Sequence, residues 1–139
     1  MTALYTAVAH ATGDGRNGHV RTDDGGVDVD VRVPEELGGP GGATNPEQLF
    51  AAGYAACFHS ALKFAALGDS LDIGDSEVSA SVGIGMLASG GFGLTVELDV
   101  YLPSLERTAA EALVERAHAT CPYSNATRGN IDVALSLVG

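Results

Sequence analysis

The order of sequence patterns predicts an α+β fold in which helices pack against antiparallel sheet. Residues 27–33 alternate between valine and polar side chains, as in a half-buried strand. Residues 49–61 form an uncharged stretch within a helical pattern, and strand patterns return after it with a second helix between them. The chain has 139 residues with no repeat and no linker, so we expect one domain over residues 1–139.

The N-terminal part predicts two strands separated by turns. Residues 3–9 and 27–33 alternate in the manner of strands. Two glycine-rich segments, at residues 13–18 and 23–26, lie between them. Because glycine adopts the backbone angles that tight turns need, both segments are predicted to be turns.

A long helix follows, with start and stop signals. Asn45 is a suitable N-cap, Pro46 fits the first turn, and Gln48 stands at the capping-box position. The helix is expected to end at Gly68. Because residues 49–61 carry no charge, this helix should be buried on all sides, and one sheet can cover only part of it. A subunit interface is the natural cover for the rest.

The C-terminal part predicts further strands around a second helix. Residues 76–88 and 92–102 have the pattern of a long hairpin, and residues 131–138 alternate as a last strand. Residues 105–120 predict the helix between them. The segment 121–130 is predicted to be irregular.

The charge balance excludes several classes of partner. The 18 acidic residues against 7 Lys and Arg give a net charge of −11, which repels nucleic acid and anionic lipid. The N-terminus lacks a basic segment followed by an apolar run, and no apolar stretch reaches the ~20 residues that a membrane span needs. We therefore expect a cytoplasmic protein without nucleic-acid or membrane partners.

Two cysteines are the first candidates for chemistry. In a cytosolic chain, Cys57 and Cys121 are more often free or redox-active than a structural disulfide. Their separation of 64 residues excludes a local CxxC pair and the common zinc patterns. A buried core residue for Cys57, and a surface thiol at a helix end for Cys121, are the plain alternatives.

The surroundings of Cys57 favour a reactive thiol. Gly53 lies one turn earlier and leaves space over the sulfur, although glycine costs a core helix about 1 kcal/mol relative to alanine. Phe50, Tyr54 and Phe58 supply apolar walls. A pocket with such walls suits an apolar substrate better than a small polar one.

The remaining polar residues are less distinctive. Arg16, in a glycine-rich turn, is either a solvated charge or a guanidinium directed at a thiolate. Glu47, in the first helical turn, also complements the helix dipole. The four histidines have no ligand spacing, so neither a metal site nor a cofactor is expected; they are His10, His19, His59 and His118.

Three long segments identify a family resemblance. ELGGPGGATNPEQLFAAGYAACFHSALKF, SVGIG and AHATCPYSNATRGNIDV strongly resemble the organic hydroperoxide resistance (Ohr) branch of the Ohr/OsmC family. The resemblance covers nearly the whole chain. It implies an OsmC-like fold, with antiparallel sheets wrapped around a long central apolar helix, in an intertwined homodimer with active sites at the interface.

The same resemblance implies thiol-dependent reduction of alkyl and fatty-acid hydroperoxides. The family's peroxidatic cysteine matches Cys57, and its resolving cysteine matches Cys121. Its arginine in the N-terminal turn matches Arg16, and the glutamate of NPEQ matches Glu47. The family is regenerated by dithiols, lipoylated proteins above all.

Cys57 needs a nearby positive charge, and its distance from Glu47 limits where that charge can come from. A thiol with an ordinary pKa is only ~3% ionised at pH 7, and Cys57 lies too far along its helix for the N-terminal dipole to help, so a cation such as Arg16 is needed. Glu47 and Cys57 are ten residues apart, which on one helix is roughly 15 Å. Glu47 is expected to orient Arg16 through a bidentate pair. Either Arg16 spans much of this gap, or Arg16 and Glu47 come from the partner subunit, which we favour.

Three alternatives remain from the sequence. The sister OsmC branch shares the segment around Cys57, although PYSNATRGN favours Ohr. The same fold could serve as a non-catalytic module that binds apolar ligands. A dithiol oxidoreductase that acts on protein disulfides would also need two cysteines.

Overall fold

The computed structural model describes all residues, from Met1 to Gly139, and divides into two compact units. The first unit comprises Met1–Leu49 and the second comprises Phe50–Gly139. Two compact units can belong to one domain, so a single domain over residues 1–139 stays a prediction.

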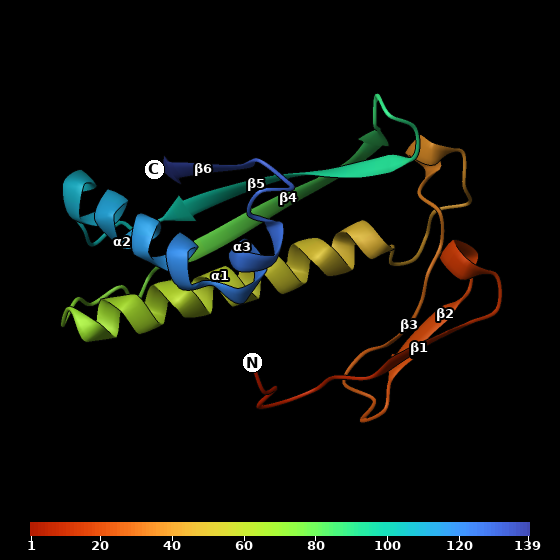
Figure 1. The fold of residues 1–139 in the computed structure, drawn as a ribbon, viewed down its shortest axis with the longest axis horizontal. Coiled ribbons are helices and arrows are strands. Elements are labelled where there is room, and N and C mark those ends of the chain that lie inside the picture. Colours follow the sequence, from red (N-terminus) through yellow and green to blue (C-terminus); the bar gives the residue numbers. More distant parts are fainter. The chain divides into compact units, whose positions relative to one another are not determined.

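The first unit contains a three-stranded antiparallel sheet with the order β1-β2-β3 (Figure 1). Its strands are β1 (Ala9–Thr12), β2 (His19–Thr22) and β3 (Asp28–Asp30). The strand predicted at residues 3–9 is wrong, because regular pairing begins only at Ala9, and the second predicted strand is shorter than residues 27–33. Strand β2 is not predicted by the sequence, because its four residues mix polar and apolar side chains without a clear alternation.

The predicted glycine-rich turn connects β1 to β2 and contains the short 3-10 helix η1 (Gly15–Asn17). Gly13 has a φ of 78°, which favours glycine. A β-carbon on Gly18 would lie 2.1 Å from the carbonyl oxygen of Thr12, so the chain can close here only without a side chain. A second 3-10 helix, η2 (Glu35–Leu37), follows the sheet.

Helix α1 (Pro46–Gly68) has the predicted bounds. The side-chain oxygen of Asn45 accepts a hydrogen bond from the backbone N–H of Gln48 at 2.9 Å, which confirms the N-cap. The prediction of burial on all sides is not met within this chain, because Phe64 and Leu67 are 77% and 78% exposed. Cover of this face by a partner subunit stays a prediction.

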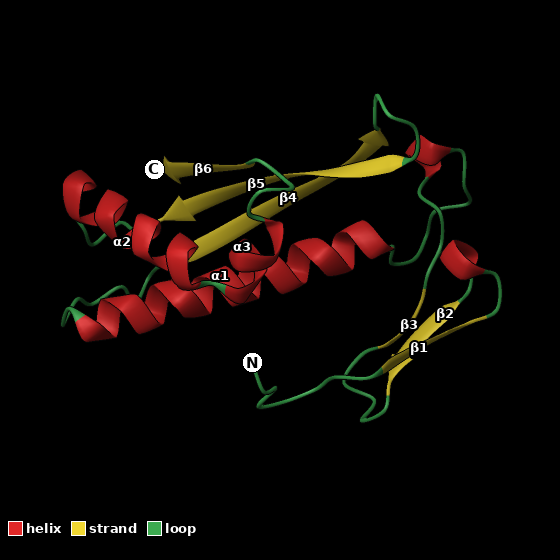
Figure 2. Cartoon of the chain, viewed as in Figure 1, coloured by secondary structure: helices red, strands yellow, loops and turns green.

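The second unit contains a sheet with the order β4-β5-β6 (Figure 2). The predicted hairpin is confirmed as β4 (Glu77–Met86) and β5 (Phe92–Tyr101), paired antiparallel. The last strand, β6 (Val133–Val138), pairs parallel to β5, which corrects the expectation of purely antiparallel sheet. The reason is the connection: a helical crossover from β5 returns the chain to the same end of the sheet.

That crossover consists of α2 (Arg107–Thr120) and α3 (Pro122–Thr127). The irregular segment predicted after α2 is wrong, because Pro122 begins α3 at a position where its missing N–H costs nothing. Figure 2 shows α1 and α2 on one side of the sheet, where they build a common apolar core. Leu62 of α1, Leu98 of β5 and Leu113 of α2 are fully buried in it. No helix combines the length and hydropathy that crossing a membrane would require.

Candidate active site

The two cysteines lie next to each other in the second unit. Cys57 is on the middle of α1, and Cys121 is at the corner between α2 and α3. The Cys121 thiol faces the Cys57 sulfur with 3.6 Å between the two Sγ atoms, and both cysteines are reduced. Cys57 is partly exposed and Cys121 is completely buried. Only Cys57 is therefore open to a reagent from solvent.

The residues around Cys57 in the second unit do not lower the pKa of its thiol. Burial raises the pKa of the Cys57 thiol, and a hydrogen bond from the backbone N–H of Tyr123 opposes this shift. No cationic side chain of the second unit acts on the thiol. A thiolate at neutral pH thus needs a positive charge from elsewhere.

Tyr123 occupies the space that the sequence analysis assigned to a ligand. A β-carbon on Gly53 would lie 2.8 Å from the Tyr123 hydroxyl oxygen and 3.2 Å from Cε2 of its ring. Gly53 therefore accommodates the Tyr123 ring, and the predicted open space over the sulfur is filled. The sequence analysis did not assign a role to Tyr123, although it follows a proline next to Cys121.

The predicted aromatic walls differ in their exposure. Phe50 is half-buried and lies near Tyr54 and Tyr123, with ring centroids 6.3 Å and 6.2 Å away. Tyr54 and Phe58 are completely buried. They support the site from the core, whereas Phe50 and Tyr123 line its accessible side.

A buried polar network connects α1 to α3. The Tyr54 hydroxyl is 2.8 Å from the Ser124 hydroxyl and 3.3 Å from that of Thr127. Ser124 Oγ is also 2.9 Å from Nδ1 of His118. This network is not predictable from the sequence, because hydroxyl side chains in a short segment give no periodic signal.

Arg16 and Glu47 form a bidentate ion pair in the first unit. The guanidinium donates from Nη1 to Oε2 at 2.9 Å and from Nη2 to Oε1 at 2.7 Å. Arg16 is 40% exposed and Glu47 is 13% exposed at the side chain. The hydrogen bonds between them raise the pKa of Arg16 and lower the pKa of Glu47, so both are charged at neutral pH. The predicted pairing of the two side chains is confirmed.

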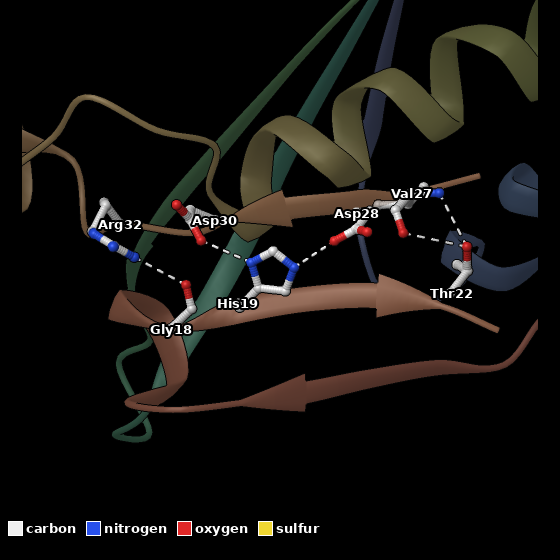
Figure 3. Close-up of polar contacts among 7 residues, drawn as sticks. All are labelled: Gly18, His19, Thr22, Val27, Asp28, Asp30 and Arg32. Atoms are coloured by element: carbon white, nitrogen blue, oxygen red, sulfur yellow. Dashed lines mark hydrogen bonds and ion pairs between the residues drawn. The ribbon is translucent and has the colours of Figure 1, made fainter. Parts of the chain in front are cut away.

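Arg32 holds the turn that carries Arg16. Its Nη1 donates to the carbonyl oxygen of Gly18 at 2.9 Å (Figure 3). The same nitrogen donates to the carbonyl oxygen of Asn17 at 3.1 Å. The side-chain oxygen of Asn17 accepts from the backbone N–H of Val33 at 2.9 Å. The turn is therefore attached at several points to the chain that follows β3.

A second charged cluster lies on the first sheet. His19 on β2 is between two carboxylates of β3, with Nδ1 2.7 Å from Asp30 and Nε2 2.5 Å from Asp28 (Figure 3). Hydrogen bonds, first with Asp30 and then with Asp28, raise the pKa of His19. No group of three or more His, Cys, Asp and Glu side chains in the chain has the arrangement of a metal site.

Comparison with known proteins gives consistent matches over most of the chain. A family model described as OsmC-like protein matches residues 39–136. The organic hydroperoxide resistance protein of Xanthomonas axonopodis pv. citri is 54% identical over 136 residues, covering 96% of this chain and 94% of that protein.

Solved structures agree with these sequence matches. An organic hydroperoxide resistance protein from Legionella pneumophila has a TM-score of 0.94 at 51% identity, with coverage of 99% of this chain and all of the other. The organic hydroperoxide resistance protein OhrB of Bacillus subtilis has a TM-score of 0.89 at 48% identity, covering 98% of this chain and 100% of that one.

Proposed function

This chain belongs to the OsmC-like family, in its organic hydroperoxide resistance branch, and we propose that it is a thiol peroxidase that reduces organic hydroperoxides through Cys57. The predicted family and the α+β, OsmC-like fold are confirmed. The relatives are named for resistance to organic hydroperoxides, and this chain is proposed to provide the same protection.

One observation carries the proposed mechanism: two thiols that are distant in sequence have their sulfurs 3.6 Å apart, and only one of them is accessible. A single reactive thiol would need no second cysteine. The arrangement is the one that an attacking thiol and a resolving thiol require.

In the first step, the Cys57 thiolate attacks the terminal oxygen of the hydroperoxide. The O–O bond breaks, the alkoxide takes a proton and leaves as an alcohol, and Cys57 becomes a sulfenic acid. In the second step, the Cys121 sulfur attacks the Cys57 sulfur, water leaves, and a disulfide forms. An external dithiol then reduces the disulfide by exchange and is itself oxidised.

Arg16 and Glu47 are proposed to activate the first step. Full ionisation of the thiol gains roughly 30-fold, or about 2 kcal/mol. A donor directed at the leaving oxygen in a dry site contributes a further ~3 kcal/mol. The bidentate pair supports both roles, because Glu47 fixes the plane of the Arg16 guanidinium.

The substrate is proposed to be an alkyl or fatty-acid hydroperoxide. Phe50 is half-buried near the Tyr123 ring, and Gly53 makes room for that ring. Tyr54 and Phe58 are completely buried in the core and support the site from behind. The proposed reductant is a dithiol, with lipoylated proteins as the natural source. We further propose that the protein is a homodimer in the cytoplasm, because this reducing compartment keeps both thiols free.

A consumption assay tests this function. The full chain is given cumene hydroperoxide or hydrogen peroxide, with dihydrolipoamide as reductant, and loss of peroxide is followed. We expect at least about tenfold faster turnover of cumene hydroperoxide, because its apolar group is partly buried on binding.

Two companion measurements, of the Cys57–Cys121 disulfide and of activity on protein disulfides, could contradict the proposal. Absence of peroxide-dependent Cys57–Cys121 oxidation would favour a non-catalytic module that binds apolar ligands. Reduction of protein disulfides without any peroxide activity would favour a dithiol oxidoreductase.

A further inference from the structure

Cys121 lies at the corner between α2 and α3, and the position of this corner depends on contacts with the rest of the second unit. The backbone N–H of Cys121 donates to the carbonyl oxygen of Ala117 at 2.8 Å, and its carbonyl oxygen accepts from the N–H of Asn125 at 2.9 Å. Helix α3 has only six residues and is too short to be stable alone. The position of the Cys121 sulfur therefore depends on what holds α3 against α1.

Two contacts hold α3 there: the packing of the Tyr123 ring against Gly53, and a buried hydroxyl network. Ser124 and Thr127 are the two buried residues of α3, and the hydroxyls of both face the Tyr54 phenol (Figure 1 shows α3 beside the middle of α1). Tyr54 lies on α1 three residues before Cys57. One phenol thus connects the helical turn next to the attacking thiol with the segment that begins at the resolving thiol.

Packing alone does not explain these polar side chains. The surrounding core is apolar, and a phenylalanine ring would fill the place of the Tyr54 ring. Every buried side-chain polar atom has a partner, which is the condition under which a polar network fixes one geometry. The hydroxyls therefore select one position of α3 among those that apolar contact would allow.

His118 gives the network a direction. Burial, followed by the nearby Arg128 charge, lowers the pKa of His118, which favours the neutral ring. With the ring proton assigned to Nε2, Nδ1 accepts a hydrogen bond. Ser124 then donates to His118, and Tyr54 donates to Ser124. Each hydroxyl has one proton, and this order uses both.

We propose that Tyr54, Ser124 and His118 are positioning residues that hold Cys121 within reach of Cys57 and thereby set the rate of disulfide formation. Tyr54 and Ser124 are completely buried, so we expect the attack of Cys57 on the peroxide to be independent of them. This inference rests on the proposed two-thiol mechanism. It attributes the rate of the second step, formation of the Cys57–Cys121 disulfide, to these three side chains.

A chromogenic aromatic disulfide separates the two halves without peroxide. The Cys57 thiolate displaces one aromatic thiolate and forms a mixed disulfide, and Cys121 then displaces the second aromatic thiolate and forms the Cys57–Cys121 disulfide. The two releases are followed as successive absorbance phases in the full-length protein. In the Tyr54→Phe variant we expect the first phase to be unchanged and the second to slow about tenfold, the factor that corresponds to about 1.4 kcal/mol for one buried hydrogen bond.

Further variants make the test specific. Ser124→Ala breaks the same hydrogen bond from the other side, so the double variant should be no slower than the slower single variant. Tyr101→Phe, the same chemical change on β5, is the matched control and should leave both phases unchanged. Thr127→Ser keeps the hydroxyl and should also leave the second phase unchanged, which shows that a substitution in α3 does not by itself slow this phase.

Two results would overturn the inference. One is a second phase at the wild-type rate in a folded Tyr54→Phe or Ser124→Ala protein, and the other is equal slowing of both phases. Failure of the proposed peroxidase function would be distinct, since the aromatic disulfide would still report the two phases while peroxide left both thiols reduced.

Discussion

The ring of Tyr123 lies directly against the backbone of Gly53, and a β-carbon at position 53 would come within 2.8 Å of the Tyr123 hydroxyl oxygen. This close approach brings the start of α3 to the turn of α1 that precedes Cys57. The backbone N–H of Tyr123 donates to the Cys57 sulfur from the same place. The absence of a side chain at position 53 therefore helps the Cys57 thiol obtain a backbone hydrogen-bond donor in addition to the Cys121 thiol.

Substitution of Gly53 by alanine tests this relationship. The variant gains up to about 1 kcal/mol of helix propensity, yet the new methyl displaces the Tyr123 ring and weakens the N–H donation to Cys57. We expect alkylation of Cys57 by iodoacetamide at fixed pH to slow about three- to tenfold, because the thiol pKa rises further. Gly68→Ala in the same helix meets no atom within 4 Å and should leave the rate unchanged. Wild-type alkylation in the Gly53 variant would contradict the coupling.

The two thiols should differ in what their removal does. Cys57→Ser is expected to abolish peroxide turnover, since a hydroxyl is not ionised at neutral pH. Cys121→Ser should permit one turnover and leave a sulfenic acid on Cys57, which dimedone and mass spectrometry detect. Unchanged steady-state activity of the Cys121 variant with the same dithiol would show that resolution does not use Cys121.

Mixing of inactive chains tests whether Arg16 acts across a subunit interface. Cys57→Ser and Arg16→Ala chains are each expected to be inactive alone. If each site combines Cys57 of one chain with Arg16 of the other, a mixed dimer holds one intact site, and up to about half of the activity per mixed dimer returns. Differently tagged chains verify subunit exchange. No recovery despite exchange would mean that both residues act within one chain.

The Arg16–Glu47 pair should contribute to stability in a pH-dependent way. The hydrogen bonds from Arg16 lower the pKa of Glu47, so the contribution is present above the unfolded-state pKa of roughly 4.3 and is lost as pH falls through the lower folded-state value. Because Arg16 is 40% exposed, we expect Glu47→Gln to lower the unfolding free energy by less than about 1 kcal/mol at pH 7. Urea unfolding should show this difference shrinking below about pH 4, and a difference that grows in acid would exclude the assigned pairing.

His19 should titrate above the ordinary range of histidine. Hydrogen bonds with Asp30 and Asp28 raise its pKa, so their contribution is complete below the unfolded-state value and is lost as pH rises through the raised folded-state value. NMR titration of the ring protons measures this directly. Asp30→Asn should bring the midpoint back toward roughly 6.5, and a midpoint that ignores this substitution would disprove the contact.

The long elements of the fold were predictable because their signals are local. The N-cap at Asn45, the uncharged stretch and the two alternating strands of the hairpin each specify structure within a few turns. The parallel pairing of β6 was not predictable in this way, since strand direction depends on the path of α2 and α3. Helix α3 was missed because six residues that include three hydroxyl side chains have no helical periodicity.

In the candidate site too, local sequence predicted the reactive residues but not the contacts between them. Chemistry and resemblance singled out Cys57 and Cys121, but no local pattern gives the 3.6 Å between sulfurs that lie 64 residues apart. The role of Gly53 was misjudged for the same reason, because the ring that fills its space comes from another helix. Tyr54 was predicted as an apolar wall, but the hydrogen bond of its hydroxyl with Ser124 joins residues 70 positions apart and has no local signal.

The complete burial of Cys121 also determines how the oxidised protein is opened again. An incoming thiolate must approach a disulfide along the axis of the bond and reach one of its sulfurs, and only that of Cys57 is accessible. On the proposed mechanism, the external dithiol therefore binds covalently to Cys57 and expels Cys121 as the leaving thiolate. The reductant and the peroxide thus enter by the same route and exclude one another, so we expect excess reductant to inhibit competitively against hydroperoxide.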